Sequence, residues 1–284
     1  MTIALFAGVT LRELVRRKLV AAVGLLTLAI VAFTAWGLHR LATTVVEGEP
    51  IAEPGVHAVA AGIVLLLAFL FTFAIALGAA LAAAPAIANE MANGEILVLL
   101  ARPIRRAEIV IGRWLGVLIA LAVYVAVAGG VELLVVRLTT GYVPPHPVTA
   151  LAFLCALAAV VTTAAVALAS RLPAIAAGIV AAMLFGLAWI AGIIESVGLA
   201  LGNQHLADAA TLVALVFPSD ALWRGALFAL QPAAFAAVSA TSSTTNVNPF
   251  SVTAPPPPAM LVWAGGWVIA VLIAGIVSVR RRDL

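Results

Sequence analysis

Charged side chains are scarce in this sequence. Its 284 residues include 15 Lys and Arg and 12 Asp and Glu, which make up 10% of the chain, whereas 65% of the residues are apolar and the mean hydropathy is +1.22. An ordinary soluble domain is about 25% charged and about 45–50% apolar. So few charges cannot cover the exterior of a water-soluble fold of this length. The composition therefore excludes a soluble enzyme or a nucleic-acid-binding domain as the default and indicates an integral membrane protein.

Several chemical motifs are also missing. Cys155 is the single cysteine, so an intramolecular disulfide is excluded. The sequence has no G-x-x-x-x-G-K-[S/T] phosphate loop, so we do not expect the chain to bind and hydrolyse ATP by itself. It also lacks H-E-x-x-H, C-x-x-C and G-x-S-x-G motifs, and its four Met and four His are scattered. We therefore expect no catalytic residues in this chain and no metal or cofactor bound by it.

Long uncharged apolar runs occupy about half of the chain. A membrane-spanning helix needs about 20 mainly apolar residues, and without water to satisfy the backbone such runs can only be helical. We expect Pro85 to end or kink the second span and the third to continue past Glu132 to Val136. The six predicted spans are residues 19–38, 56–84, 114–131, 149–169, 174–194 and 259–279.

The Lys and Arg residues are distributed unequally about these spans. Of the 15, only Arg40, Arg137 and Arg224 lie on the side opposite both termini. Cytoplasmic loops carry the excess of Lys and Arg, so we predict an all-α, multi-pass protein of the cell (inner) membrane with both termini in the cytoplasm. A cleaved signal peptide ending near Ala32-x-x-Ala35 is the alternative for the first run, but its apolar stretch and its preceding segment are long for one.

The N-terminal residues 2–18 mix apolar side chains with Arg12, Arg16 and Arg17. This pattern predicts an amphipathic helix that lies in the cytoplasmic interface, with its arginines toward anionic headgroups. A charged flank to the first span is the alternative interpretation.

The first cytoplasmic connection, residues 89–113, is the most informative stretch. Asn93-Gly94 favours a turn, a short apolar run follows, and Pro103 ends it. Three charged residues then open the next helix: Arg105, Arg106 and Glu108. A short helix held at the membrane surface with exposed charges would bind a cytoplasmic partner. The alternative is a solvated connector whose arginines only set the topology.

The outer segment before the last span, residues 196–258, is the longest connection. Apolar residues 212–217 and 221–230 predict two short helices at the outer leaflet, and Ser219-Asp220 would cap the second. An additional pair of spans is the alternative, which the shortness of each piece and the charged residues beside them disfavour.

Four ionisable residues near the outer ends of the spans, or just beyond them, are candidates for a translocation pathway or an outer gate. An ionisable residue within the membrane is a functional-site hypothesis by default. Near the outer end of a helix, where water is close, a structural or interfacial role is the alternative, and Glu132 could pair with Arg137. The four candidates are Glu132, Glu195, Asp220 and Arg224.

The cytoplasmic connection carries a combination of motifs. Glu90-x-x-x-Gly94 is followed by leucines and then by Arg102-Pro103-Ile104-Arg105-Arg106-x-Glu108-Ile109-Val110-x-Gly112-Arg113. With the six spans, the N-terminal helix and the long outer segment, it resembles the permease subunits of ABC-2 type ABC transporters over essentially the whole chain. That family usually has a small hydroxyl residue, a Ser and a Lys where this chain has Glu95, Arg105 and Arg113.

The resemblance implies one transmembrane domain, residues 1–284, that works as a dimer with a second permease copy or a related chain. A separate cytoplasmic ATPase subunit would bind ATP and Mg²⁺ and would dock on the coupling segment, so that ATP hydrolysis drives export. The resemblance assigns ATPase coupling to Glu90, Gly94, Glu95, Arg102, Pro103, Arg105, Arg106 and Glu108.

A narrower resemblance links Phe217-Pro218-Ser219-Asp220, Arg224 and the outer segment to permeases that help to mature the copper sites of nitrous oxide reductase. It implies an extracytoplasmic partner protein.

Two other functional classes stay open. A self-sufficient secondary transporter or channel usually has charges or broken helices at mid-membrane depth, which these spans lack. A membrane-embedded enzyme would need acidic, His or Ser side chains clustered at one depth. Nothing in the sequence marks the cargo.

Overall fold

The computed structural model describes residues 2–16, 18–46, 49–92, 105–233, 252 and 254–281, and this part of the chain is almost entirely helical. The fold class predicted from the sequence is confirmed. A two-residue antiparallel pair joins β1 (Val45–Val46) to β2 (Glu49–Pro50) between the first two spans. The helices are α1 (Thr2–Arg16), α2 (Lys18–Ala42), α3 (Glu53–Ala92), α5 (Arg106–Tyr124), the π-helix η1 (Val125–Gly129), α6 (Gly130–Thr140), α7 (Pro147–Ala169), α8 (Ala174–Ala200), α9 (Gln204–Val216), α10 (Ser219–Leu230) and α12 (Pro258–Arg280).

Six helical segments of the described chain are long and apolar enough to cross a membrane, as predicted. The third of them runs unbroken from Arg106 to Thr140 through η1, and so extends beyond the predicted end at Val136. Pro85 does not end the second span, because α3 continues through it as far as Ala92. Proline is tolerated inside a membrane helix, since neighbouring groups satisfy the freed backbone carbonyl.

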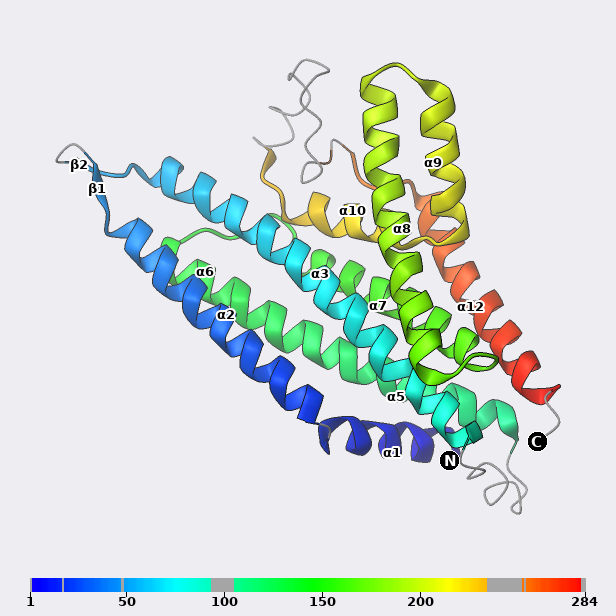
Figure 1. The fold of residues 1–284 in the computed structure, drawn as a ribbon. Coiled ribbons are helices and arrows are strands. Elements are labelled where there is room, and N and C mark those ends of the chain that lie inside the picture. The colour runs from blue at the N-terminus through cyan, green and yellow to red at the C-terminus, as the bar shows by residue number, and fades with distance from the viewer. Residues whose placement is uncertain are drawn as a thin grey trace.

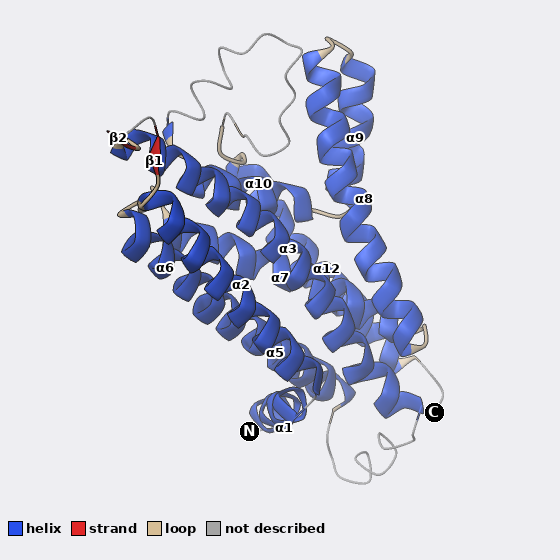
Figure 2. Cartoon of the chain, turned by 60° about the vertical axis from the view of Figure 1, so that its left-hand side comes forward, coloured by secondary structure: helices blue, strands red, loops and turns tan. Residues whose placement is uncertain are grey.

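The helices form an inclined bundle with different features at its two ends (Figure 1). At one end, near both termini, α1 lies across the bundle at a steep angle to α2. At the other end, α8 and α9 form a hairpin, and α9 meets α10 at a bend of 99°. Figure 2 shows the hairpin projecting beyond α10. The excess of Lys and Arg assigns the end with the termini to the cytoplasm.

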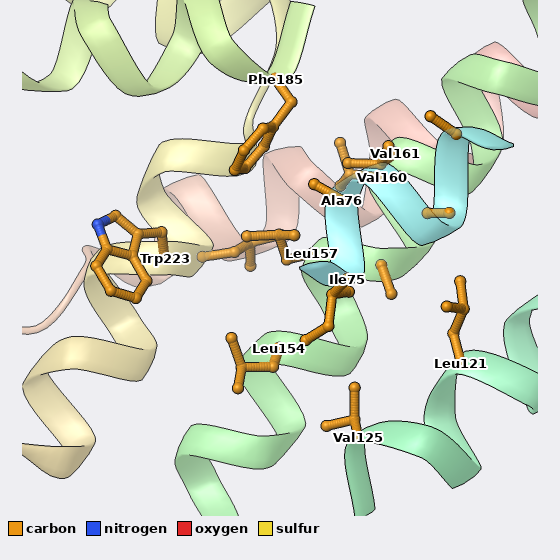
Figure 3. Packing of buried hydrophobic residues seen from close by; sticks show 14 of the residues in the cluster. Ile75, Ala76, Leu121, Val125, Leu154, Leu157, Val160, Val161, Phe185 and Trp223 are labelled. Atoms are coloured by element: carbon orange, nitrogen blue, oxygen red, sulfur yellow. The ribbon is translucent and has the colours of Figure 1, made fainter. Parts of the chain in front are cut away.

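Helix α7 is the centre of the bundle. It packs against α3, α5, α8, α10 and α12, which agrees with a sequence that is apolar around the whole helix. Figure 3 shows Leu157 and Val161 of α7 beside Ile75 of α3, with Phe185 of α8 and Trp223 of α10 nearby. By contrast, α2 buries only Thr34 and Leu38 among its described side chains, so most of its apolar surface faces outward.

Candidate functional site

The closest helix contact at the cytoplasmic end is between α1 and α5. A Cβ atom added at Gly112 would lie 2.5 Å from Phe6 Cβ, and one added at Gly116 would lie 2.7 Å from Thr10 Cβ. Glycines four residues apart lie on one face of a helix and let a second backbone approach closely. The pair therefore forms the seat on which α1 rests, and α1 buries Phe6, Ala7, Thr10 and Leu14.

Polar contacts fix α1 in this seat. Arg113 Nη1 donates hydrogen bonds to Glu13 Oε2 at 2.7 Å and to Thr10 Oγ1 at 3.2 Å. Thr2 Oγ1 donates to Glu108 Oε2 at 2.6 Å. Charge-assisted bonds of this kind are stronger than neutral ones, and these three join both ends of α1 to the first two turns of α5. The two helices are thus tied together where α5 follows the connection from α3.

Two further contacts join the end of α12 to this cytoplasmic region. Arg106 Nη1 donates to the Val279 carbonyl at 3.1 Å, and Arg171 Nε, in the turn between α7 and α8, donates to Ser278 Oγ at 3.0 Å. Hydrogen bonds therefore connect α1, α5, α12 and the α7–α8 turn at this end.

The structure places the predicted coupling residues unevenly. Arg105 is the exposed N-cap residue of α5, whereas Arg106 and Glu108 hold other helices as described above. Glu90 lies near the end of α3, and its side chain is outside the described part of the structure. On α1, Arg12 and Arg16 are exposed, as expected for a helix that faces headgroups. Five predicted residues lie outside the described part altogether: Arg17, Gly94, Glu95, Arg102 and Pro103.

Sequence reasoning did not single out the seat itself. Gly112 and Arg113 were part of the family-like motif but received no role, and the partners on α1 had none either. The available signal was the spacing Gly112-x-x-x-Gly116 opposite an amphipathic N-terminal segment.

A second cluster of charges joins α8, α9 and α10 at the outer end. Arg224 Nη2 donates to the Gly192 carbonyl at 2.6 Å and to Glu195 Oε2 at 2.8 Å, and Arg224 Nε lies 2.7 Å from Asp220 Oδ2. Thr211 Oγ1 of α9 donates to Glu195 Oε1 at 3.3 Å. One arginine thus holds the sharp bend between α9 and α10 against α8.

Burial controls the electrostatics of this cluster. Asp220 is only 6% exposed. Its helix α10 lies outside the six candidate spans and passes the same test only together with α9, as a pair bent by 99°. Burial raises the pKa of Asp220 to about 6; the charge of Arg224 opposes the rise and the charge of Glu195 adds to it. Since each charge has a partner, the arrangement is that of an internal brace.

Three of the four predicted outer residues therefore come together, and Glu132 is separate. It lies on α6 beside Thr34 of α2. The suggested pairing with Arg137 is not formed. Five residues on a helix separate two side chains by about 140°, and Arg137 is exposed. The predicted cap at Ser219-Asp220 is also wrong, because the N-cap residue of α10 is Pro218, with no side-chain cap bond, and the Asp220 carboxylate pairs with Arg224 instead.

The comparison with known families agrees with this architecture. A family model described as ABC-2 family transporter protein matches residues 7–284. The chain belongs to this family. It is therefore a transmembrane permease subunit of an ABC transporter in the inner membrane, of a kind that generally pairs with an ATPase subunit. No curated protein sequence matches this ABC-2 permease.

Within the described residues of the permease, no group of three or more His, Cys, Asp and Glu is placed to hold a metal ion. The charged contacts of the described residues link helices. At the cytoplasmic end they join α1 and α12 to α5, and at the outer end they hold a bend.

Proposed function

We propose that two copies of this permease form an exporter with separate ATPase subunits, which bind ATP and Mg²⁺ and dock at the cytoplasmic end. The ATPases would contact residues 89–108 and the exposed surface of α1. The observation that carries the proposal is the fixed α1–α5 unit, built on Gly112, Gly116 and the Arg113–Glu13 ion pair, which includes the last part of the predicted coupling segment, residues 89–113.

This unit gives a physical route from the ATPase to the spans. A force applied before Arg106 acts on the first turn of α5, and α1 follows because the glycine contacts and the ion pair leave no room for sliding. The Arg106 bond to Val279 draws α12 into the same movement. Closely packed helices transmit such a displacement as rigid elements. ATP-driven closure of the ATPases would thus tilt several spans together.

The test uses the tagged full chain, expressed in the cell that naturally encodes it together with that cell's ABC ATPases, and extracted from the membrane in a mild detergent. We expect an ABC ATPase to co-purify with the permease in a complex whose permease content is two copies. Arg105→Glu reverses an exposed charge at the start of α5 and should weaken the capture of the ATPase or its rate of ATP hydrolysis. Arg137→Glu, which reverses an exposed charge at the opposite end of the third span, is the matched control.

Absence of any ATPase from the native preparation would contradict the proposal and favour the self-sufficient transporter. If the two charge reversals have equal effects, the ATPase remains the partner, but Arg105 is not part of the surface on which it docks.

The outer hairpin is the proposed contact for an extracytoplasmic partner. It projects beyond α10 (Figure 2) and exposes Leu199, Leu201 and Leu212, which are 59%, 72% and 65% accessible. Exposed apolar side chains on a segment that projects from the bundle are typical of an interaction surface. Replacing the three leucines by Ser should abolish the capture of such a partner by the native complex and leave the ATPase bound; capture that persists in the variant would contradict this contact. The copper-enzyme maturation role is the narrower form of the same proposal.

A further inference from the structure

A cavity of about 470 Å³ lies between the first four spans of the permease. Small-molecule pockets occupy about 300–1,000 Å³, so the cavity is large enough for a ligand. Its walls come from α2, α3, the continuous helix α5–η1–α6 and α7, and they are almost wholly apolar. It extends from Leu81, toward the cytoplasmic end of α3, to Leu230 of α10 at the outer end.

The cavity opens sideways, toward the bilayer. Leu26 of α2 and Leu70 and Leu77 of α3 belong to its lining, yet they are 61%, 50% and 47% exposed. Lining residues that are also exposed mark the rim of an opening, and this rim runs along the two helices α2 and α3. In a membrane that surface is covered by lipid, so a molecule dissolved in the bilayer can enter without passing through water.

One acidic side chain lies in this apolar lining. Glu132 borders the cavity, and its Oε1 atom is buried without a hydrogen-bond partner in the described part of the chain. A buried polar atom without a partner costs free energy, and a native structure normally supplies a partner for it. Glu132 lies about 12 Å from the outer end of α6. The missing partner would therefore be a hydrogen-bond donor located in the outer part of the cavity.

The π-helix contributes to the same site. Val125–Gly129 immediately precedes α6, whose third residue is Glu132, and Ala128 and Gly129 belong to the lining. A π-turn holds one more residue than an α-turn, so it rotates every side chain that follows by about 100°. Single π-turns inside α-helices are frequent at functional sites. Here the rotation determines which face of α6 carries Glu132.

We propose that this cavity binds a single-chain, lipid-like amphiphile, whose head group donates a hydrogen bond to Glu132 and whose apolar chain lies along α3 toward Leu81. The apolar length and the sideways opening select an apolar chain, and the unpaired carboxylate oxygen selects a donor such as a hydroxyl. That this amphiphile is the class of cargo rests on the proposed export function; that the cavity binds it does not.

The test compares two photoreactive probes on the purified native complex. One is hexadecanol with a diazirine on its chain, and the other is the hexadecane analogue with the same diazirine and no hydroxyl. We expect labelling of cavity residues on α3 and α6, with the alcohol favoured over the hydrocarbon by about tenfold, as one hydrogen bond to a charged group allows. Equal labelling by the two probes, or labelling away from the cavity, would overturn the proposal.

Two pairs of variants locate the site. Glu132→Leu removes the acceptor and should abolish the preference for the alcohol, whereas Glu132→Gln keeps an acceptor oxygen and should retain part of it. Leu67→Trp fills the cavity and should block both probes, whereas Leu66→Trp, on the neighbouring residue that does not line it, should not. A preference that survives in Glu132→Leu contradicts the role of Glu132. If Glu132→Leu does not fold, two results still test the cavity site: the preference of the native protein for the alcohol, and the difference in labelling between Leu67→Trp and Leu66→Trp.

The other occupant to be distinguished is a second copy of the permease. In a Cys155→Ala background, Leu77→Cys at the rim should not be cross-linked to its equivalent in the other copy by a short bifunctional reagent; efficient cross-linking would show that the partner fills the opening.

A separate measurement follows ATP hydrolysis by the complex. Stimulation by hexadecanol supports the assignment as cargo, and binding without stimulation removes that assignment while leaving the cavity site intact.

Discussion

Gly192 of α8 leaves no space between its backbone and the carboxylate of Asp220 on α10. A Cβ atom added at residue 192 would lie 2.5 Å from Asp220 Oδ2 and closer still to Oδ1. The Gly192 carbonyl also accepts a hydrogen bond from Arg224. The absence of a side chain at one position thus allows the brace between the two helices to form.

Gly192→Ala should therefore destabilise the permease. Asp220 would have to move from Arg224 while still buried, and overpacking of this kind costs about 1–3 kcal/mol. Gly186→Ala is the matched control, because it lies on the same helix and a Cβ there meets nothing within 4 Å. The measurement is the thermal unfolding midpoint of each variant in nanodiscs. Equal midpoints for the two alanine variants would contradict the close contact.

The same cluster predicts a dependence of stability on pH. Burial raises the pKa of Asp220 from 3.8 to about 6 in the folded chain, so the folded state keeps its proton where the unfolded state has already lost it. Stability contributed by this group is complete below about pH 4 and is lost as the pH rises to about 6. Asp220→Asn removes this titration. The difference in unfolding midpoint between the native protein and Asp220→Asn should fall from pH 4 to pH 6 and then stay constant. A difference that is flat over this range would contradict it.

The sequence was sufficient for the spans but not for the contacts between them. A run such as residues 149–169 has to be a helix in lipid whatever its neighbours are, so its prediction needed no tertiary information. The approach of Arg224 to Glu195 depends on the 99° bend after α9, which no local pattern specifies.

The errors have the same origin. Glu132 and Arg137 are close in sequence, and their pairing was inferred from that closeness although helical geometry separates them. Asp220 has the residue type of a cap, but it is the second residue of α10 and pairs with the arginine four residues later. The π-turn at Val125–Gly129 had no recognised signal, because its residues are as apolar as those of an ordinary span.

The glycine seat of α1 predicts a specific loss of coupling. Gly112→Ala would place a methyl group 2.5 Å from Phe6 Cβ, so α1 would have to move away from α5. We expect normal membrane insertion, a lower unfolding midpoint, and ATP hydrolysis that no longer depends on the permease. Gly130→Ala, farther along the same continuous helix and with nothing within 4 Å of the added atom, should behave as the native protein does. The proposed route from ATPase to spans fails if both variants remain coupled.

The contacts of Arg113 on α5 predict which substitutions at residue 113 preserve the packing of α1. Two of its hydrogen bonds, to Glu13 and Thr10, come from the atom Nη1, and a lysine ammonium can donate to two such acceptors as well. Arg113→Lys should therefore keep both contacts, with a change in stability of about 1 kcal/mol or less. Arg113→Met removes the charge and both of these hydrogen bonds, so its unfolding midpoint and its coupling should both fall. Combining Arg113→Met with Glu13→Gln should lower the midpoint by less than the sum of the two single changes, because each single change removes the same ion pair. Thermal unfolding of the native protein, Arg113→Lys, Arg113→Met, Glu13→Gln and the double variant measures this, and an additive double variant would show that Arg113 and Glu13 do not interact.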